Sequence, residues 1–221
     1  MIIYLPQSWV HSFEFSFYTF FLKPYFLFLE KIFDVDLFVR TLAVEVLTGN
    51  WDGLWNGNNY FLYYNPTVSK FQYFRQDLDV AFGIWDTFYN MIDKPIYTWG
   101  DGGRGYRLIN RVLANPTFKA SFTNYCYQLI NTYYKLVGSF SDRMFFINEE
   151  LRPIVARDKW RETDFAWSFD EFAAQPVQNI VRIPGENWLA GYPEVIDYAL
   201  QIFMEERIRT ALVELDPSSS F

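Results

Sequence analysis

Polar residues of the kind that bind metal ions flank two aromatic runs near the middle of the chain. Asp52 lies in a loop rich in Gly and Asn, and Asn58 and Asn59 close that loop. Asp77 and Asp79 follow the second aromatic run. If the chain folds back between the runs, the two asparagines face Asp77, and Asp52 arrives at the same end. Carboxylate and amide oxygens are the ligands that Mg²⁺ prefers, so the spacing indicates an oxygen-rich metal site.

The order of these residues along the chain is that of the phosphoryl-transfer residues of protein kinases. Those enzymes have a catalytic-loop Asp, an Asn a few residues later, a short hairpin and then a metal-binding Asp. The same residue types also occur in ordinary turns, where Asp and Asn side chains bond to the nearby backbone. Spacing alone therefore leaves two alternatives open, a kinase-like metal site and a set of residues that only cap turns.

Two aromatic strands are predicted to position these residues. Residues 60–64 and 71–74 are strongly aromatic, and the turn formers Asn65-Pro66-Thr67 separate them. This pattern predicts a β-hairpin, with its open end beside Asp52 and Asp77.

The rest of the chain is predicted to be mainly helical. Apolar residues recur there at helical spacing, with Tyr133 among those expected to face inward. The expected helices run from Asp34 or Asp36 to about Leu47, over about 106–113 and 117–136, from near Ser141, and from Pro193 to Asp216, with a mixed loop over 159–192. These elements predict an α+β fold, in which an aromatic hairpin with an acidic loop packs on a mainly helical domain.

The composition is that of a globular protein of one domain or one large lobe. Its 221 residues can bury a sizeable core, and 51% of them are hydrophobic and 22% aromatic. The net charge of −7 argues against a nucleic-acid partner, which needs a basic surface. Residues 13–29 are rich in Phe and Leu, but Glu14, Lys23 and Pro24 interrupt them. We expect neither a membrane span nor a signal peptide there.

Single copies of Cys and His exclude several kinds of site. Cys126 is the only cysteine, so the chain has no internal disulfide and no cysteine-based zinc site. Its place among Phe122, Leu129 and Ile130 predicts a buried thiol on a helix face. His11 is the only histidine and lies far from the acidic residues in sequence, which argues against a Ser-His-Asp or Cys-His mechanism.

A glycine-rich stretch at residues 100–105 has the spacing GxGxxG before a helix. In a dinucleotide-binding turn an acidic residue follows about 20 residues later. No Asp or Glu occurs from 102 to 141, so we interpret the stretch as a flexible loop that leads into the helix. Arg104 and Arg107 could meet a phosphate there, although a solvated basic turn is the more common outcome.

Several short motifs resemble the signature of the CotH (spore-coat protein H) kinase family. The matching stretches are Asn50-Trp51-Asp52, Asn58-Asn59-Tyr60-Phe61-Leu62-Tyr63, Lys70-Phe71, Asp77-Leu78-Asp79 and Phe82-Gly83. Flanking matches are Asp34-Val35-Asp36, Leu108-Ile109-Asn110-Arg111 and Ile208-Arg209. The resemblance covers roughly residues 33–215, and residues 50–83 are its most specific part.

The resemblance implies a fold and a chemistry. In that family the fold is like a much-altered protein kinase, and the activity is phosphorylation of protein with ATP and magnesium. It implies that this chain forms a protein-kinase-like C-terminal lobe with Asp52 as the catalytic residue. Asn58, Asn59 and Asp77 then stand at the metal ligands, with Asp79 as the reserve for the second Asp. Mg or Mn and ATP are the implied cofactors, and an unidentified protein is the implied substrate.

Two departures from the family pattern bear on activity. The family usually has Pro-Trp before the second Asp, where this chain has Arg75-Gln76. The first 48 residues contain no glycine and only Lys23 and Lys31 as lysines, so we expect no phosphate-covering loop or ATP-anchoring lysine there. Phosphoryl transfer depends almost entirely on positioning and charge. We therefore expect an apparently N-terminally truncated member that is weak or inactive alone.

The expected organisation has three parts: an irregular aromatic segment over 1–32, a CotH-like catalytic lobe over 33–216 and a tail over 217–221. Two further functions stay open. One is a non-catalytic, degenerate relative that binds partners or belongs to a surface or spore coat. The other is a plain metal-binding or scaffold domain. The resemblance suggests an extracellular, spore-coat or cell-surface location for the full-length parent.

Overall fold

A computed structural model describes residues 2–3, 28–85, 89–134, 139–160, 168–182 and 195–216. The segment predicted to be neither a membrane span nor a signal peptide lies almost wholly outside these residues, as does His11. The chain forms two compact units. The first consists of Met1–Asp79 and Pro95–Tyr127, and the second of Val80–Lys94 and Gln128–Phe221. Each unit combines helices with a small antiparallel sheet, so the predicted α+β class is confirmed.

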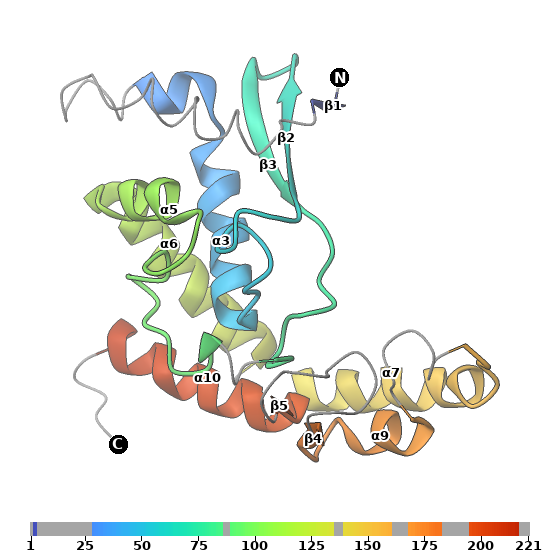
Figure 1. The fold of residues 1–221 in the computed structure, drawn as a ribbon. Coiled ribbons are helices and arrows are strands. Elements are labelled where there is room, and N and C mark those ends of the chain that lie inside the picture. The colour runs from blue at the N-terminus through green and yellow to red at the C-terminus, as the bar shows by residue number, and fades with distance from the viewer. Residues whose placement is uncertain are drawn as a thin grey trace. The chain divides into compact units, whose positions relative to one another are not determined.

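The sheet of the first unit is built on the predicted hairpin (Figure 1). Strand β2 (Tyr60–Asn65) pairs antiparallel with β3 (Lys70–Arg75), and β1 (Ile2–Ile3) pairs with the other edge of β2. Tyr60 lies opposite Arg75 at the open end, and Asn65 lies opposite Lys70 at the turn. Aromatic rings contact each other across the strands, as Tyr64 and Phe71 do with centroids 5.3 Å apart. Such cross-strand pairs fix the register.

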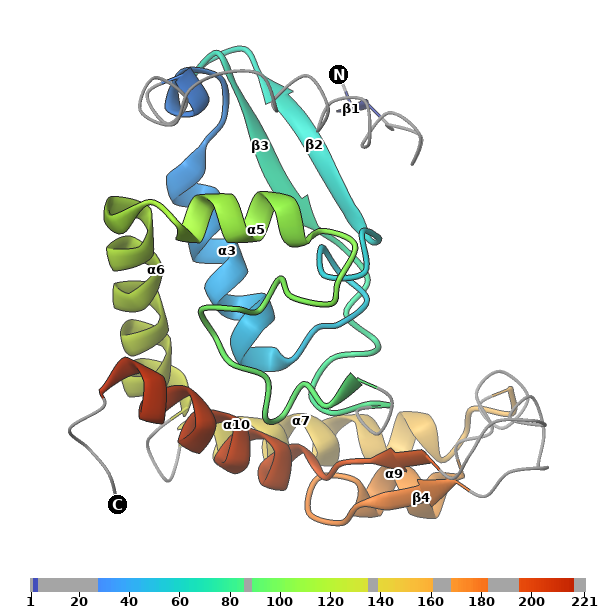
Figure 2. The same cartoon turned by 60° about the vertical axis from the view of Figure 1, so that its left-hand side comes forward.

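Helix α3 (Val35–Thr48) packs against β3 and carries the core of the first unit, as Figures 1 and 2 show. The Asp34 side chain caps its N-terminus by accepting a hydrogen bond from the Leu37 backbone N–H at 3.1 Å. Gly49 ends it with a φ of 63°, a conformation that glycine adopts without strain. The Phe38 ring meets the Tyr73 ring edge-on at 5.5 Å. The cap and this packing fix where the following loop begins.

Helices α5 (Tyr106–Leu113) and α6 (Pro116–Leu129) follow the predicted pattern, and the Cys126 thiol is fully buried as expected. The chain then continues as a π-helical turn, η2 (Ile130–Tyr134). Tyr133 was predicted to face inward, but its side chain is 59% exposed. The wider π turn changes the angle between successive side chains, so the helical spacing that placed Tyr133 inward fails beyond Leu129.

The second unit contains α7 (Ser139–Val155), α9 (Phe169–Ala174), β4 (Ile180–Arg182), β5 (Val195–Asp197) and α10 (Leu200–Leu215). Figure 2 shows α9 and β4 beside α7. Phe203 and Met204 of α10 form its core with Ile92, and Phe82 and Phe140 pack against them. The arrangement buries the inner face of α10 within its own unit.

Two predictions about the C-terminal part were wrong. Residues 195–197 form a strand, and the last helix begins at Leu200 instead of Pro193. The β-branched Val195 and Ile196 pair with β4, and Asp197 is buried and accepts a hydrogen bond from the Trp85 backbone N–H at 3.0 Å. These tertiary partners override the helical pattern. The expected mixed loop also contains the short helix α9, which Ser168 and Glu171 begin with a capping box.

Candidate functional site

The open end of the hairpin brings together the residues that the sequence analysis singled out. The ladder continues one pair beyond the strands, because the Gln76 backbone N–H donates to the Asn59 carbonyl at 2.9 Å. Asn58 and Asp77 are the next residues on the two strands, so both lie at this end of the hairpin. All of these residues belong to the first unit. The site is therefore positioned by one hairpin and by the loop that enters it.

The Asp52 carboxylate is held by the side chains of three asparagines. Its Oδ1 accepts from Asn56 Nδ2 at 2.7 Å and from Asn58 Nδ2 at 3.4 Å. Its Oδ2 accepts from Asn59 Nδ2 at 2.9 Å. Two short hydrogen bonds on different oxygens fix the plane of the carboxylate. Its remaining lone pairs can still accept a hydrogen bond from another donor. Asn56 was not among the predicted site residues, although its place in the Asn-rich loop is visible in the sequence.

Asp77 and Asp79 form a carboxyl pair on the other side of the hairpin mouth. The pKa of Asp79 is raised, first by partial burial, then by the charge of Asp77 and a hydrogen bond with its side chain, and to a lesser extent by the charge of Asp52. Two carboxyl groups this close repel each other when both are ionised, so the protonated form of Asp79 is favoured more than it is in water. The three acids therefore share one electrostatic environment.

The backbone on both sides of the mouth has a left-handed conformation. Asn59 has a φ of 48° and Asp77 a φ of 53°. Asn and Asp accept positive φ more readily than other residues with a side chain, but the conformation still costs some strain. Asn59 and Asp77 lie where the β-ladder ends. Their left-handed backbone therefore turns both strands away from the sheet at the acidic cluster.

The donor set suits a hard cation in its chemistry, although it does not form a closed cage. Among the described residues, no three His, Cys, Asp or Glu side chains come close enough together to bind one metal ion. The carboxylates of Asp77 and Asp79, with Asp52 and the amides of Asn58 and Asn59, supply only oxygen ligands. Mg²⁺ commonly keeps several waters or phosphate oxygens beside one or two carboxylates, which matches an open site of this kind.

The glycine-rich stretch at 100–105 packs against the loop that carries Asp52. The Gly105 backbone N–H donates to the Trp55 carbonyl at 3.1 Å, and the indole N–H of Trp55 donates to the Asp101 carbonyl at 3.4 Å. A Cβ on Gly103 or Gly105 would collide with the backbone of Trp55 or Leu54. The glycines therefore allow close approach of two loops, a role that the GxGxxG spacing did not reveal.

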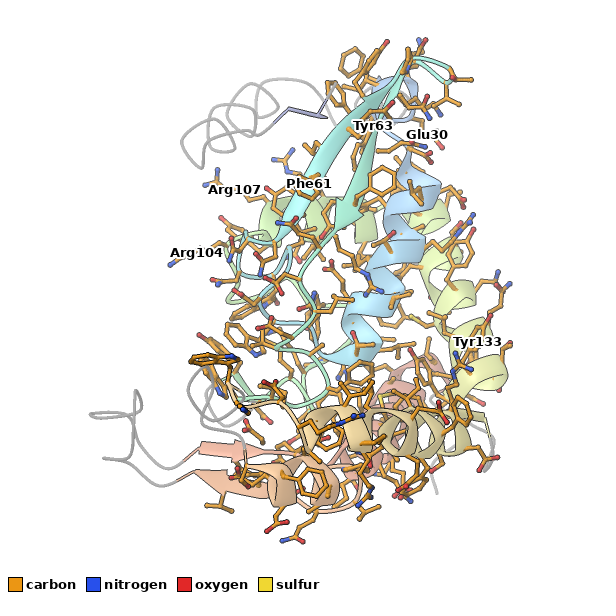
Figure 3. All side chains as sticks on the ribbon, turned by 90° about the vertical axis from the view of Figure 1, so that its right-hand side faces the viewer. Glu30, Phe61, Tyr63, Arg104, Arg107 and Tyr133 are labelled. Carbon is orange, nitrogen blue, oxygen red and sulfur yellow. The ribbon has the colours of Figure 1, made fainter. Side chains whose placement is uncertain are left out.

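Arg104 lies in the glycine-rich stretch, and Arg107 lies just after it. An added Cβ on Gly57 would lie 3.2 Å from Arg104 Cβ, so Arg104 is a neighbour of the acidic loop. Arg107 stacks on the adjacent Tyr106 ring with its guanidinium carbon 5.6 Å from the centroid. Figure 3 shows both arginine side chains extending outward from this region.

Comparison with known proteins identifies the family. The CotH kinase protein family matches residues 23–201, which include the whole hairpin and its acidic mouth. This chain belongs to the CotH kinase protein family. It is 29% identical over 171 residues to invasin CotH3 of Rhizopus delemar, and the match covers 72% of this chain and 28% of that protein.

Two further relatives come from the same organism. Invasin CotH2 is 29% identical over 168 residues, which are 72% of this CotH-family chain and 28% of the relative. Spore coat protein homolog 1 is 30% identical over 142 residues, which are 62% of this chain and 21% of the relative. The chain thus spans less than a third of the length of these relatives. Across its described residues, no helix has both the length and the apolar character needed to cross a membrane.

Proposed function

We propose that this CotH-family chain forms the catalytic part of an atypical protein kinase that transfers a phosphoryl group from Mg-ATP to protein hydroxyls. The observation that carries the proposal is the carboxyl pair of Asp77 and Asp79 within electrostatic reach of Asp52 at one hairpin mouth. Family membership supports it through the family's description as kinases. In protein kinases a catalytic Asp and the metal ligands have the same order around a hairpin, and the proposal assigns that arrangement to this chain.

Each side chain has a role in this proposal. Asp52 accepts a hydrogen bond from the acceptor hydroxyl and orients it, because Asn56 and Asn59 keep its carboxylate in one plane. Asp77 binds the magnesium ion with Asn58 or Asn59, and Asp79 is the second carboxylate within reach. Bound Mg-ATP supplies the phosphoryl group and the positive charge that stabilises its transfer. Nothing in these roles needs His11 or Cys126.

A second candidate function is a non-catalytic, partner-binding protein of a cell surface or coat. Arg75-Gln76 in place of the family's usual Pro-Trp before the second Asp favours it. The names of the relatives, invasins and a spore coat protein homolog, support a surface or coat location for the parent protein in either case. The protein substrate or partner in both functions is unidentified by sequence.

The first test is a melting experiment with and without millimolar Mg²⁺ or Mn²⁺. We expect either ion to raise the melting temperature, because a ligand that binds only the folded state adds about 2.7 kcal/mol at a hundred times its dissociation constant. Asp77→Asn should raise the metal-free melting temperature by removing one of two repelling carboxyls, and should abolish the response to metal. Asn also tolerates the left-handed backbone at this position.

The matched control is Asp36→Asn, which changes an exposed carboxylate on α3 that pairs with Arg40 at 2.6 Å. It should retain the full response to metal. A wild-type protein indifferent to both ions, together with a less stable Asp77→Asn, would show that these acids only cap turns and would sink the kinase-like site.

A further inference from the structure

A polar cluster is buried directly behind the loop that carries Asp52. Glu45 lies in the last turns of α3 with its side chain 0% exposed, and Asn50 and Tyr73 are buried with it. The Tyr73 hydroxyl donates to Glu45 Oε1 at 2.6 Å. Neither the sequence motifs nor the proposed site uses Glu45 or Tyr73, and Asn50 enters only through the motif Asn50-Trp51-Asp52. The Glu45 carboxyl group therefore links helix α3 to strand β3. Neither the helix nor the strand requires a charged residue at this position.

Glu45 also holds the first part of the acidic loop. Its backbone carbonyl accepts hydrogen bonds from the backbone N–H groups of Gly49 and Asn50, the latter at 3.0 Å. The backbone of Leu54 forms a hydrogen bond with its carboxyl group. A Cβ at Gly53 would lie only 3.2 Å from Oε1. Glu45 thus holds the loop on both sides of Asp52, with its backbone carbonyl at residues 49 and 50 and with its carboxyl group at residues 53 and 54.

The charges around Glu45 compensate its burial only in part. Burial raises its pKa, while the Tyr73 hydrogen bond, the charge of Arg75 and the Leu54 hydrogen bond each lower it. The net result is a pKa of about 7. Tyr60 contacts the far side of the Tyr73 ring at 5.5 Å and is the other titratable group packed there. Neither Glu45 Oε2 nor the side-chain amide of Asn50 makes a hydrogen bond. A buried carboxyl group with an unsatisfied oxygen lowers stability.

An apolar side chain of similar size would often stabilise such a position more than a buried charge does. Stability therefore does not account for Glu45, whereas its contacts with residues 49–54 do account for the shape of the loop. We infer that Glu45 is a positioning residue, whose carboxyl group clamps the loop at residues 53 and 54 and so sets where Asp52 stands at the hairpin mouth. The catalytic role of Asp52 rests on the proposed function. The inference that Glu45 positions the loop does not depend on it.

The clamp should respond to pH in a defined direction. Opening the loop exposes Glu45 to water, where its pKa returns towards the ordinary value of 4.5, whereas in the closed loop it is about 7. The closed state binds the proton more tightly, so a rise in pH between these values favours opening. The loop is held firmly when Glu45 is protonated and is released as it ionises.

Hydrogen–deuterium exchange of residues 50–59 tests this, after correction for the intrinsic pH dependence of amide exchange. Wild-type protection of this segment should fall as the pH rises through 7. Glu45→Gln keeps an oxygen for the Tyr73 hydroxyl and the Leu54 backbone but cannot ionise, so its protection should be the same from pH 5 to 8. Glu45→Leu removes both hydrogen bonds, and exchange of the segment should quicken about tenfold.

Helix α6 is the internal control, and its protection should not change with pH in this way. The matched control variant is Asp36→Asn, which keeps Glu45 and should show the same fall in loop protection as the wild type. Equal loosening of α6 and the loop in Glu45→Gln would indicate a merely structural role and overturn the proposal, as would loop protection that is independent of pH in the wild type. If Glu45→Leu does not fold, the comparison of wild type with Glu45→Gln still decides. Because the readout needs no metal, it is independent of the melting test of the proposed site.

Discussion

At the scale of single residues, the raised pKa of Asp79 beside Asp77 is the feature with the most direct chemical consequence. Folding raises the pKa of Asp79 above 3.8, chiefly through partial burial and the neighbouring carboxyl of Asp77. The folded protein therefore binds this proton more tightly than the unfolded chain. The stability that it contributes is present at low pH and is lost as the pH rises through the raised pKa of Asp79. A divalent cation at the proposed site would compete with this proton for the oxygens of Asp79.

The first prediction for this pair is that Mn²⁺ binds more tightly as the pH rises, with release of a proton. Titration calorimetry in two buffers of different ionisation enthalpy measures the number of protons released. Asp79→Asn should bind Mn²⁺ without that proton release. Equal heats in both buffers for the wild type would mean that Mn²⁺ displaces no proton from Asp79.

At the scale of elements, α3 and the hairpin act together through one buried contact. Tyr73 of β3 and Glu45 of α3 are both buried, and their hydrogen bond crosses the interface between the helix and the sheet. Burial raises the pKa of Glu45 from 4.5 to about 7 and also raises that of Tyr73, again chiefly by desolvation. The packing of helix on sheet therefore depends on the protonation of Glu45 in the neutral range.

We predict that the free energy of unfolding falls as the pH rises from 4.5 to about 7, where the unfolded chain has lost the proton and the folded chain has not. The fall attributable to Glu45 is on the order of 3 kcal/mol, from 1.36 kcal/mol per pKa unit. Urea unfolding over this pH range should show it in the wild type and in Asp36→Asn. Glu45→Gln should have a flatter profile and greater stability at pH 8. A Glu45→Gln profile as steep as that of the wild type would assign the pH dependence to other groups.

Local chemistry made several elements predictable from sequence, whereas elements that depend on distant partners were not. Asp34, Gly49 and the turn at residues 65–67 carry their own backbone preferences, so the bounds of α3 and the hairpin follow from the residues themselves. Strand β5 depends on β4, and the π turn after Leu129 depends on packing in the second unit. The spacing of apolar residues in the sequence reveals neither the pairing of distant strands nor the position of a π-helical turn.

The candidate site shows the same division between local and distant information. The register that pairs Tyr60 with Arg75, and so brings Asn58 and Asp77 to the same end of the hairpin, follows from strand length and turn position, both of which are visible in sequence. The hydrogen bond from Asn56 to Asp52 and the Glu45 clamp depend on how the loop folds over α3. Helical spacing from Phe38 and Leu42 places Glu45 on the apolar face of α3, but the spacing does not reveal its partner Tyr73.

At the scale of the whole molecule, the acidic site and the last helices belong to different units. Asp79 is the last residue of the first segment of the first unit, and the second unit begins at Val80. In the second unit, Phe203 of α10 is fully buried, whereas α7 has a run of exposed apolar side chains. The exposed residues on α7 are Phe145, Phe146, Ile147, Leu151 and Ile154.

Substitutions in the second unit should therefore differ sharply in cost. Phe203→Ala is expected to destabilise the protein by about 3–5 kcal/mol, because it leaves a cavity in the core. Phe146→Ser should change stability by no more than ~0.5 kcal/mol, because this side chain is 57% exposed. Chemical denaturation of both variants measures the difference. A large loss in Phe146→Ser would show that the outer face of α7 is covered in solution.

The fully buried Cys126 on α6 also provides the protein with an internal reporter. It is the only thiol among the 221 residues, so any reaction with a thiol reagent records the exposure of one known atom in the first unit. At low reagent concentration, the labelling rate of the native protein is proportional to the fraction of molecules in which this helix is open. Because Asp52 and Asp77 lie in the same unit, Mn²⁺ should slow the labelling by the factor one plus its concentration divided by its dissociation constant. A rate unchanged by Mn²⁺ would mean that the opening which exposes Cys126 leaves the hairpin mouth intact.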